Sequence, residues 1–164
     1  MPEVEIKFQV NAARAAAVRA ALGRARCAST RLRALYFDTA ERRIAAAGFA
    51  LRLRREGRQW IQALKGRGDG ALARLEHEVA LGAGAGVPMP DLARHAGTPE
   101  HAALLAALNG PLGALAPLFE IQVVRLHRVV RHRGASIELA FDEGWIHSAA
   151  GKAPITSARP PVLT

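Results

Sequence analysis

Charged side chains recur at every second position along several short segments of this sequence, and they are the residues best suited to chemistry. In Glu3–Val10 the alternation places Glu3, Glu5 and Lys7 on one face and four apolar side chains on the other. The charged positions on such strand-like runs include Glu3, Glu5, Lys7, Arg52, Arg54, Lys65, Arg74, Glu76, Glu78, Arg125, Glu138 and Asp142. These polar faces therefore combine carboxylates with guanidinium and ammonium groups.

Faces that carry both signs of charge have two interpretations. On a one-sided antiparallel sheet, each charged face is simply solvated. If the strands close into a barrel, the charges gather in a lumen, where they are tolerable only when they are paired or bound to a ligand. Carboxylates would then supply oxygen ligands for a hard divalent ion such as Mg²⁺ or Mn²⁺, and Arg and Lys would bind phosphate oxygens. This second interpretation predicts a site for a metal–polyphosphate complex.

The segments that must position these residues are mostly short strands joined by hairpin-length turns. The expected strands are Glu3–Val10, Arg31–Phe37, Phe49–Arg55, Gln59–Lys65, Leu72–Leu81, Leu118–Val130 and Ala135–Asp142. The expected helices are Ala12–Leu22 with Asn11 as N-cap, a short helix through Ala47 whose capping box is Asp38 and Glu41, and Thr98–Leu108. This pattern predicts an α+β fold, with an antiparallel sheet or barrel and the helices packed outside it.

Composition limits the classes of protein that remain. The chain has 164 residues and a net charge of +9, and half of its residues are hydrophobic, which argues against intrinsic disorder and suits one domain. We expect no membrane-spanning helix and no membrane partner. A single cysteine suggests a reducing, cytoplasmic compartment. The basic charge, carried mostly by Arg, predicts a polyanionic partner.

The motifs, taken together and in order, resemble the CYTH domain, also called the triphosphate tunnel metalloenzyme family. The matching segments are Glu3-Val4-Glu5-Ile6-Lys7, Tyr36-Phe37-Asp38-Thr39, Leu51-Arg52-Leu53-Arg54, Ala63-Leu64-Lys65-Gly66, Arg74-Leu75-Glu76-His77-Glu78, Pro117-Leu118-Phe119 to Arg125, and Ile137-Glu138 to Asp142. The sequence is most similar to the bacterial inorganic triphosphatase branch. The resemblance implies an eight-stranded antiparallel tunnel that holds a triphosphate and requires a divalent metal, Mg²⁺ or Mn²⁺.

The resemblance also implies a role for each charged position. The implied metal ligands are Glu3, Glu5, Glu76, Glu78 and Asp142, with Glu138 on the same face as Asp142. The implied phosphate-binding and catalytic residues are Lys7, Arg52, Arg54, Lys65, Arg74 and Arg125. His77 has the opposite parity to its neighbouring glutamates, which indicates an outward, structural role. If these roles hold, Arg52→Ala or Glu5→Ala should lower phosphate release from tripolyphosphate at least about tenfold.

The predicted activity is metal-dependent hydrolysis of a small triphosphate, above all inorganic triphosphate to diphosphate and phosphate. Within the family, the alternatives are thiamine triphosphate as substrate, or ATP converted to cyclic AMP by a class IV-type adenylate cyclase. A catalytically impaired triphosphate- or polyphosphate-binding module is a further alternative. A nucleic-acid binder is disfavoured, because the chain has only eight Phe, Trp and Tyr residues for stacking and the strand-borne Arg residues alternate with acids.

The resemblance ends before the C-terminus, so we expect a CYTH domain over residues 1–155 and a divergent or truncated tail over residues 156–164. Family members have an acidic E-x-E-x-E strand here, whereas this chain has Ser157 and Arg159 where glutamates are expected. Pro160-Pro161 cannot continue a paired central strand. We therefore expect a tunnel that lacks its last strand, through truncation, a shifted reading frame or divergence. The unpaired edge could support a homodimer.

Overall fold

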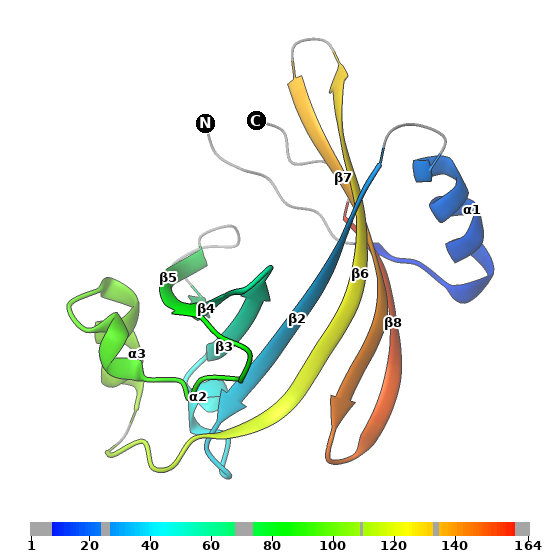
Figure 1. Cartoon of the computed structure of the whole chain (residues 1–164). Helices are drawn as coiled ribbons and strands as arrows, with labels where there is room; N and C mark the ends of the chain where they lie inside the picture. The colour runs from blue at the N-terminus through cyan, green and yellow to red at the C-terminus, as the bar shows by residue number, and fades with distance from the viewer. Residues whose placement is uncertain (1–7, 24–26, 68–73, 109, 133–134, 160–164) are drawn as a thin grey trace. The chain divides into compact units, whose positions relative to one another are not determined.

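The computed structural model describes residues 8–23, 27–67, 74–108, 110–132 and 135–159. These residues form eight strands, three α-helices and one 3₁₀ helix (Figure 1). In chain order the elements are β1 (Phe8–Gln9), α1 (Ala12–Gly23), β2 (Ala28–Asp38), α2 (Arg43–Ala46), β3 (Phe49–Glu56), β4 (Gln59–Arg67), β5 (Arg74–Ala83), η1 (Leu92–His95), α3 (Pro99–Ala107), β6 (Ala116–His132), β7 (Ala135–Ser148) and β8 (Gly151–Arg159).

The strands form one antiparallel sheet in the order β1-β8-β7-β6-β2-β3-β4-β5, which confirms the predicted α+β class and antiparallel sheet. Over the described residues the sheet is not closed, and β1 and β5 are its two edges. Contacts divide the chain into two compact units. The first combines Met1–Leu32 with Ile121–Thr164, and the second is Arg33–Glu120.

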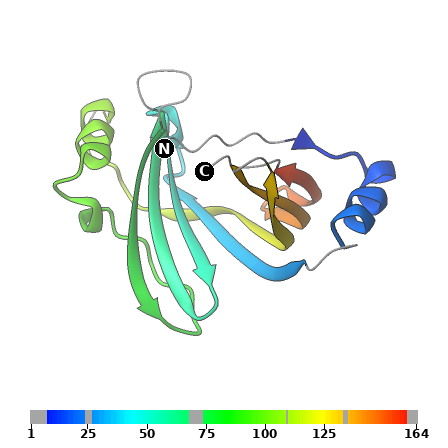
Figure 2. The same ribbon diagram turned by 90° about the horizontal axis from the view of Figure 1, so that it is seen from above.

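The second unit is built on the alternation of β3. Leu51 and Leu53 are fully buried, as their spacing predicts, and they belong to a core with Leu35, Phe37, Ile44 and Trp60. The helices η1 and α3 pack on β4 and β5 (Figure 2). Thr98 caps α3 through a hydrogen bond that its Oγ1 accepts from the amide of His101, so the predicted helix Thr98–Leu108 is confirmed to within its ends. One face of this part of the sheet is therefore core, and the other is left for charged residues.

The prediction of a capping box at Asp38 and Glu41 was wrong. The N-cap position of α2 is Arg42, which has a left-handed backbone (φ 56°) and makes no side-chain cap. The buried carboxylate of Asp38 does the capping from outside the helix: Oδ1 accepts hydrogen bonds from the amides of Thr39 and Ile44, and Oδ2 from the amide of Ala45. The Asp38-Thr39 pair of the family motif therefore has a structural role in this chain.

In the first unit, α1 covers one face of the strands. Asn11 is its N-cap, as predicted, and its Oδ1 accepts a hydrogen bond from the amide of Arg14. The buried side chains Ala15, Leu22 and Phe141 form the core here, with Val18, Leu126 and Leu139 packed against them. Gly144 lets β7 approach β6, because a Cβ at this position would lie 1.9 Å from the carbonyl oxygen of Gln122.

The prediction that the last strand is missing needs a correction. Residues 151–159 form β8, which pairs with β7 along its whole length and with β1 through Phe8 and Gln9. Pro154 lies within this strand. Ser157 is the cross-strand partner of Asp142, at a position where the resemblance expects a glutamate. Within the described residues, the last strand is therefore present, but Ser157 replaces an acidic side chain of the family pattern.

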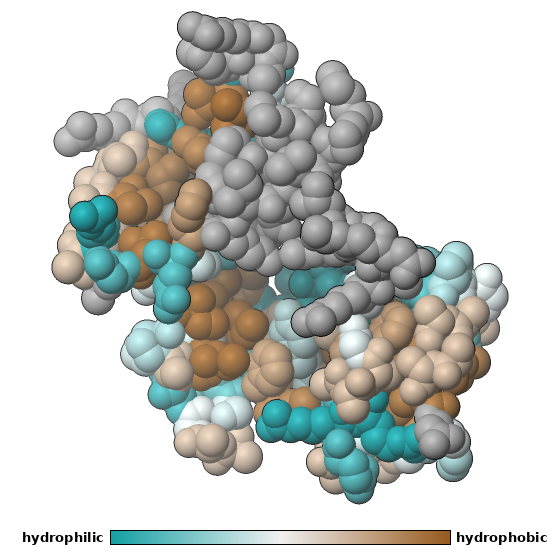
Figure 3. Space-filling view, turned by 180° about the vertical axis from the view of Figure 1, so that it is seen from behind, coloured by the Kyte–Doolittle hydropathy of each residue, from teal (hydrophilic) through white to brown (hydrophobic). Residues whose placement is uncertain are grey.

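Exposed apolar side chains are distributed over both units. Phe8, Val129 and Trp145 are the most exposed in the first unit, and Met89 and Leu105 in the second. Figure 3 shows apolar surface bordered by hydrophilic residues on the face seen from behind. No helix among the described residues is long and apolar enough to cross a membrane. The predicted homodimer stays a prediction.

Candidate functional site

Six charged residues follow one another across β3, β4 and β5 in the second unit, on the face opposite its core. The register explains their placement: Ala50 pairs with Lys65, and Lys65 pairs with Glu76, so these side chains lie on the same face. We call this set the ion-pair row. Its members are Arg52, Arg54, Glu56, Lys65, Glu76 and Glu78. The sequence-based prediction that the cations and glutamates of these strands share a face is therefore confirmed for this part of the chain.

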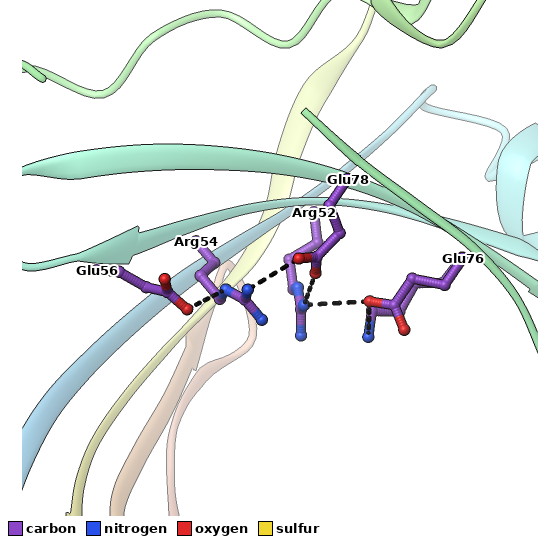
Figure 4. Close-up of polar contacts among 6 residues, drawn as sticks. Arg52, Arg54, Glu56, Glu76 and Glu78 are labelled. Carbon is purple, nitrogen blue, oxygen red and sulfur yellow. Dashed lines mark hydrogen bonds and ion pairs between the residues drawn. The ribbon is translucent and has the colours of Figure 1, made fainter. Parts of the chain in front are cut away.

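At one end of the row, Lys65 and Arg52 share a carboxylate. Lys65 Nζ lies 2.5 Å from Glu76 Oε1, and the same oxygen lies 3.8 Å from Arg52 Nη2. Arg52 Nη2 also lies 3.4 Å from Glu78 Oε1 (Figure 4). Arg52 is therefore held between two glutamates of β5.

At the other end, Arg54 is held by carboxylates from two strands. Its Nη2 donates a hydrogen bond to Glu78 Oε2 at 3.0 Å, and its Nε lies 2.8 Å from Glu56 Oε1 (Figure 4). Although this second distance is short, the buried Nε atoms of Arg54 and Arg52 make no aligned hydrogen bond. The contact with Glu56 is therefore best described as an ion pair.

The row is partly open to solvent. The side chain of Arg52 is 14% exposed, and those of the other five members are between 28% and 48% exposed. Burial alone would raise the pKa of Glu76, but its contacts with Lys65 and Glu78 and the charges of Lys65 and Arg52 lower that pKa overall. Glu76 therefore stays ionised beside Lys65 and Arg52. An arriving anion must displace carboxylates from these cations, or the carboxylates must be neutralised.

Several predicted site residues cannot be placed beside the row. Glu3, Glu5 and Lys7 lie outside the described residues. The backbone of Arg74 lies in β5 and pairs with Arg67, but its side chain is not among those described. Their predicted roles stay predictions.

In the first unit, two further predicted residues bind each other. Arg125 donates from Nε and Nη2 to the two carboxylate oxygens of Asp142, at 2.7 Å each. The side chain of Asp142 is only 9% exposed. His127 Nδ1 lies 3.4 Å from Glu138 Oε1. Arg125 and Asp142, implied as a phosphate ligand and a metal ligand, thus form a bidentate pair.

The described carboxylates do not by themselves make a metal centre. Glu76 and Glu78 have the oxygen chemistry that Mg²⁺ or Mn²⁺ prefers, but both are engaged by cations. Across the described ranges, no group of three or more His, Cys, Asp or Glu side chains is arranged to hold a metal ion. A complete centre would need ligands beyond these residues.

Sequence reasoning missed two features of the charged face. Glu56 lies one residue beyond the expected strand Phe49–Arg55, although it has the same parity as Arg52 and Arg54, and extending the alternation by one step would have found it. Tyr36 is the cross-strand partner of Arg52 and stacks on Phe119, with ring centroids 4.5 Å apart and an interplanar angle of 19°. No spacing in the sequence predicts that these two rings stack, because they come from segments that are far apart in the chain.

His77 lies on the core side of β5, so the predicted structural role is supported by its contacts. Its Nδ1 is 2.8 Å from Nδ1 of the fully buried His95, whose Nε2 is 2.9 Å from Gln62 Nε2. Burial, together with the charges of His77 and His101, lowers the pKa of His95 to about 4, against the smaller opposing effects of Glu100 and Asp91. This network holds η1 against β4 and β5 behind the ion-pair row.

Comparisons with solved structures find the same fold in proteins of low sequence identity. A candidate adenylate cyclase from Bacillus halodurans is 16% identical with a TM-score of 0.62, and the match covers 97% of this chain and 79% of that one. A candidate adenylyl cyclase from Hippeastrum with a dominant triphosphatase activity is 18% identical with a TM-score of 0.56, covering 99% of this chain and 80% of that one. No curated protein sequence is significantly similar. A model of the CYTH domain matches residues 1–147, and with the antiparallel sheet and the charged face this shows that the chain belongs to the CYTH family.

Proposed function

We propose that this protein hydrolyses inorganic triphosphate to diphosphate and phosphate. Membership of the CYTH family supports an enzyme that acts on triphosphate phosphoanhydride bonds. The observation that carries the finer proposal is the ion-pair row, in which Arg52, Arg54 and Lys65 follow one another on a single face of β3 and β4.

The spacing of these cations suits a chain of phosphates better than a single phosphate. Alternate residues of a strand lie about 6.6 to 6.8 Å apart, and neighbouring strands about 4.8 Å apart. Arg52, Arg54 and Lys65 therefore offer donors along a line longer than one phosphate group. Because Arg donates in a planar fork, it can contact two oxygens of a phosphate at once.

The reaction would be the attack of water on a terminal phosphoryl group. The contribution of the chain would be electrostatic, because fixed guanidinium and ammonium groups stabilise the charge that develops on the phosphate oxygens. Glu76 and Glu78 would orient the water or accept its proton once the phosphates have taken over their cations. A divalent ion, for which we keep Mg²⁺ or Mn²⁺ as the proposed identity, would neutralise part of the substrate charge when bound.

A triphosphate-binding module without turnover is the second candidate. Ser157 stands opposite Asp142 at a position where the family pattern has an acid, and this observation favours weaker metal binding than in members that carry the acid. Thiamine triphosphate and ATP stay as alternative substrates. The single cysteine keeps the cytoplasm as our proposed compartment.

The test is phosphate release by the purified chain, with Mg²⁺ or Mn²⁺, from tripolyphosphate, ATP and thiamine triphosphate in parallel. The proposal expects tripolyphosphate to be hydrolysed with the highest kcat/KM. Cyclic AMP formed from ATP would instead assign the cyclase reaction. Calorimetric binding of tripolyphosphate without any phosphate release would assign the binding module.

A further inference from the structure

Glu56 is the member of the ion-pair row that neither the sequence motifs nor the family resemblance assigns. It lies at the end of β3, two residues after Arg54 and on the same face, and its side chain is 48% exposed (Figure 4). The other two glutamates of the row each contact two cations, whereas Glu56 forms an ion pair with Arg54.

We propose that Glu56 is a built-in competitor for Arg54: its carboxylate occupies the guanidinium in the empty site and weakens the binding of phosphate anions there. This inference rests on the proposed function for the role of Arg54. It adds a residue that sets how tightly anions bind at this site, because each anion must compete with the Glu56 carboxylate for Arg54.

The geometry separates Glu56 from the other carboxylates. Arg54 reaches Glu78 across to β5 through Nη2, while Glu56 lies at the Nε side, 2.8 Å away. An anion that binds the Nη end of Arg54 must therefore overcome the charge of Glu56 even after it has replaced Glu78. Since the Nε contact is not an aligned hydrogen bond, the effect of Glu56 is mainly its charge.

The expected size follows from the exposure of the pair. Ion pairs that are this open to solvent shift equilibria modestly, so removing the charge should tighten anion binding about two- to fivefold. The effect should be smaller at high salt, because screening weakens exposed pairs.

The experiment is calorimetric titration of the wild-type chain, Glu56→Gln and Glu41→Gln with inorganic tripolyphosphate and, separately, inorganic phosphate. Glu41→Gln is the matched control, because it removes the same charge from an exposed position of the same unit. We expect Glu56→Gln to bind both anions more tightly than the wild type, with the larger gain for the more highly charged tripolyphosphate, and Glu41→Gln to match the wild type. Equal or weaker binding by Glu56→Gln overturns the inference.

A second pair of variants tests whether Glu56 acts through Arg54. In an Arg54→Ala background, Glu56→Gln should change the affinity by less than it does in the wild type. An unchanged gain would mean a general charge effect and would overturn the inference. If the wild type binds tripolyphosphate without hydrolysing it, the proposed function fails while the affinities still decide the role of Glu56. If neither the wild type nor Glu56→Gln binds either anion, the inference is overturned.

Discussion

Arg52 in the second unit and Arg125 in the first are both strand-borne arginines that contact carboxylates, yet their surroundings differ. Arg52 faces two glutamates at 3.4 and 3.8 Å, and those glutamates are shared with other cations. Arg125 makes two 2.7 Å hydrogen bonds to one nearly buried carboxylate, that of Asp142. Long contacts that are shared with other cations, and whose glutamates are 34% and 35% exposed, can be exchanged for a ligand at little cost. A short bidentate pair with a nearly buried partner resists exchange, because breaking it leaves a charge without compensation.

The largest expected effect therefore belongs to the first unit. Arg125→Ala should reduce the free energy of unfolding by about 3–5 kcal/mol, because it removes the charge that compensates the nearly buried Asp142 carboxylate. Arg52→Ala should change it by no more than about 1 kcal/mol. Urea denaturation of the two variants measures both values.

Removing both partners sharpens this comparison. Arg125→Ala combined with Asp142→Ala should recover much of the lost stability, because no unpaired charge remains. Equal destabilisation by Arg125→Ala and Arg52→Ala would remove the distinction between the two regions.

A second contrast lies inside the second unit, between Asp38 and the glutamates of the row. Asp38 accepts three backbone hydrogen bonds while it is buried, so Asp38→Ala should cost about 2 kcal/mol of stability, the upper end for a helix cap. Glu41 was wrongly expected to share the capping, so Glu41→Ala should change the free energy of unfolding by no more than about 0.5 kcal/mol. Thermal unfolding of the two variants compares them directly, and similar melting temperatures would show that Asp38 does not cap α2.

A further expected effect is a pH dependence of stability that comes from His95, behind the row. Unfolded His95 regains an ordinary pKa of about 6.5, whereas its pKa in the folded chain is about 4. Between these values the unfolded chain binds a proton that the folded chain does not. Stability should therefore fall as the pH drops from about 6.5 to about 4, and this contribution should level off below it.

His95→Gln isolates the contribution of His95 to the pH dependence of stability, because it removes the titrating ring. Its melting temperature should depend less steeply on pH across that window than the melting temperature of the wild type. Parallel slopes for the two proteins would assign the pH dependence to other groups.

The sequence alone predicted the parts of the fold and site that depend on alternation. The period of two in these strands predicted that their charged side chains share one face, and the register of β3 to β5 confirms this shared face. The residues are Arg52, Arg54, Lys65, Glu76 and Glu78. The extent of β7 and β8 was not predicted, because Gly144 and Pro154 both read as breaks in a strand. In the structure, Gly144 allows a close approach to β6, and Pro154 is accommodated inside β8 opposite Trp145.

The contact partners of the charged and polar residues were the part of the site that the sequence could not predict. Nothing in the local spacing shows that Arg125 binds Asp142, that His77 contacts His95, or that Asp38 caps α2 from outside. These contacts join segments that are brought together only by the sheet and its covering helices. Sequence patterns therefore placed charges on a face, but they could not distinguish an exchangeable contact from a fixed one.

The most direct test of the ion-pair row as a phosphate site is the rate of phosphate release from tripolyphosphate by three proteins: the wild type, Arg52→Ala and Arg58→Ala. Arg58 is the control, because it is an exposed arginine in the turn after β3. The expected result is a rate at least about tenfold lower for Arg52→Ala, at unchanged stability, and a rate close to wild type for Arg58→Ala. Unchanged phosphate release by folded Arg52→Ala would contradict the account.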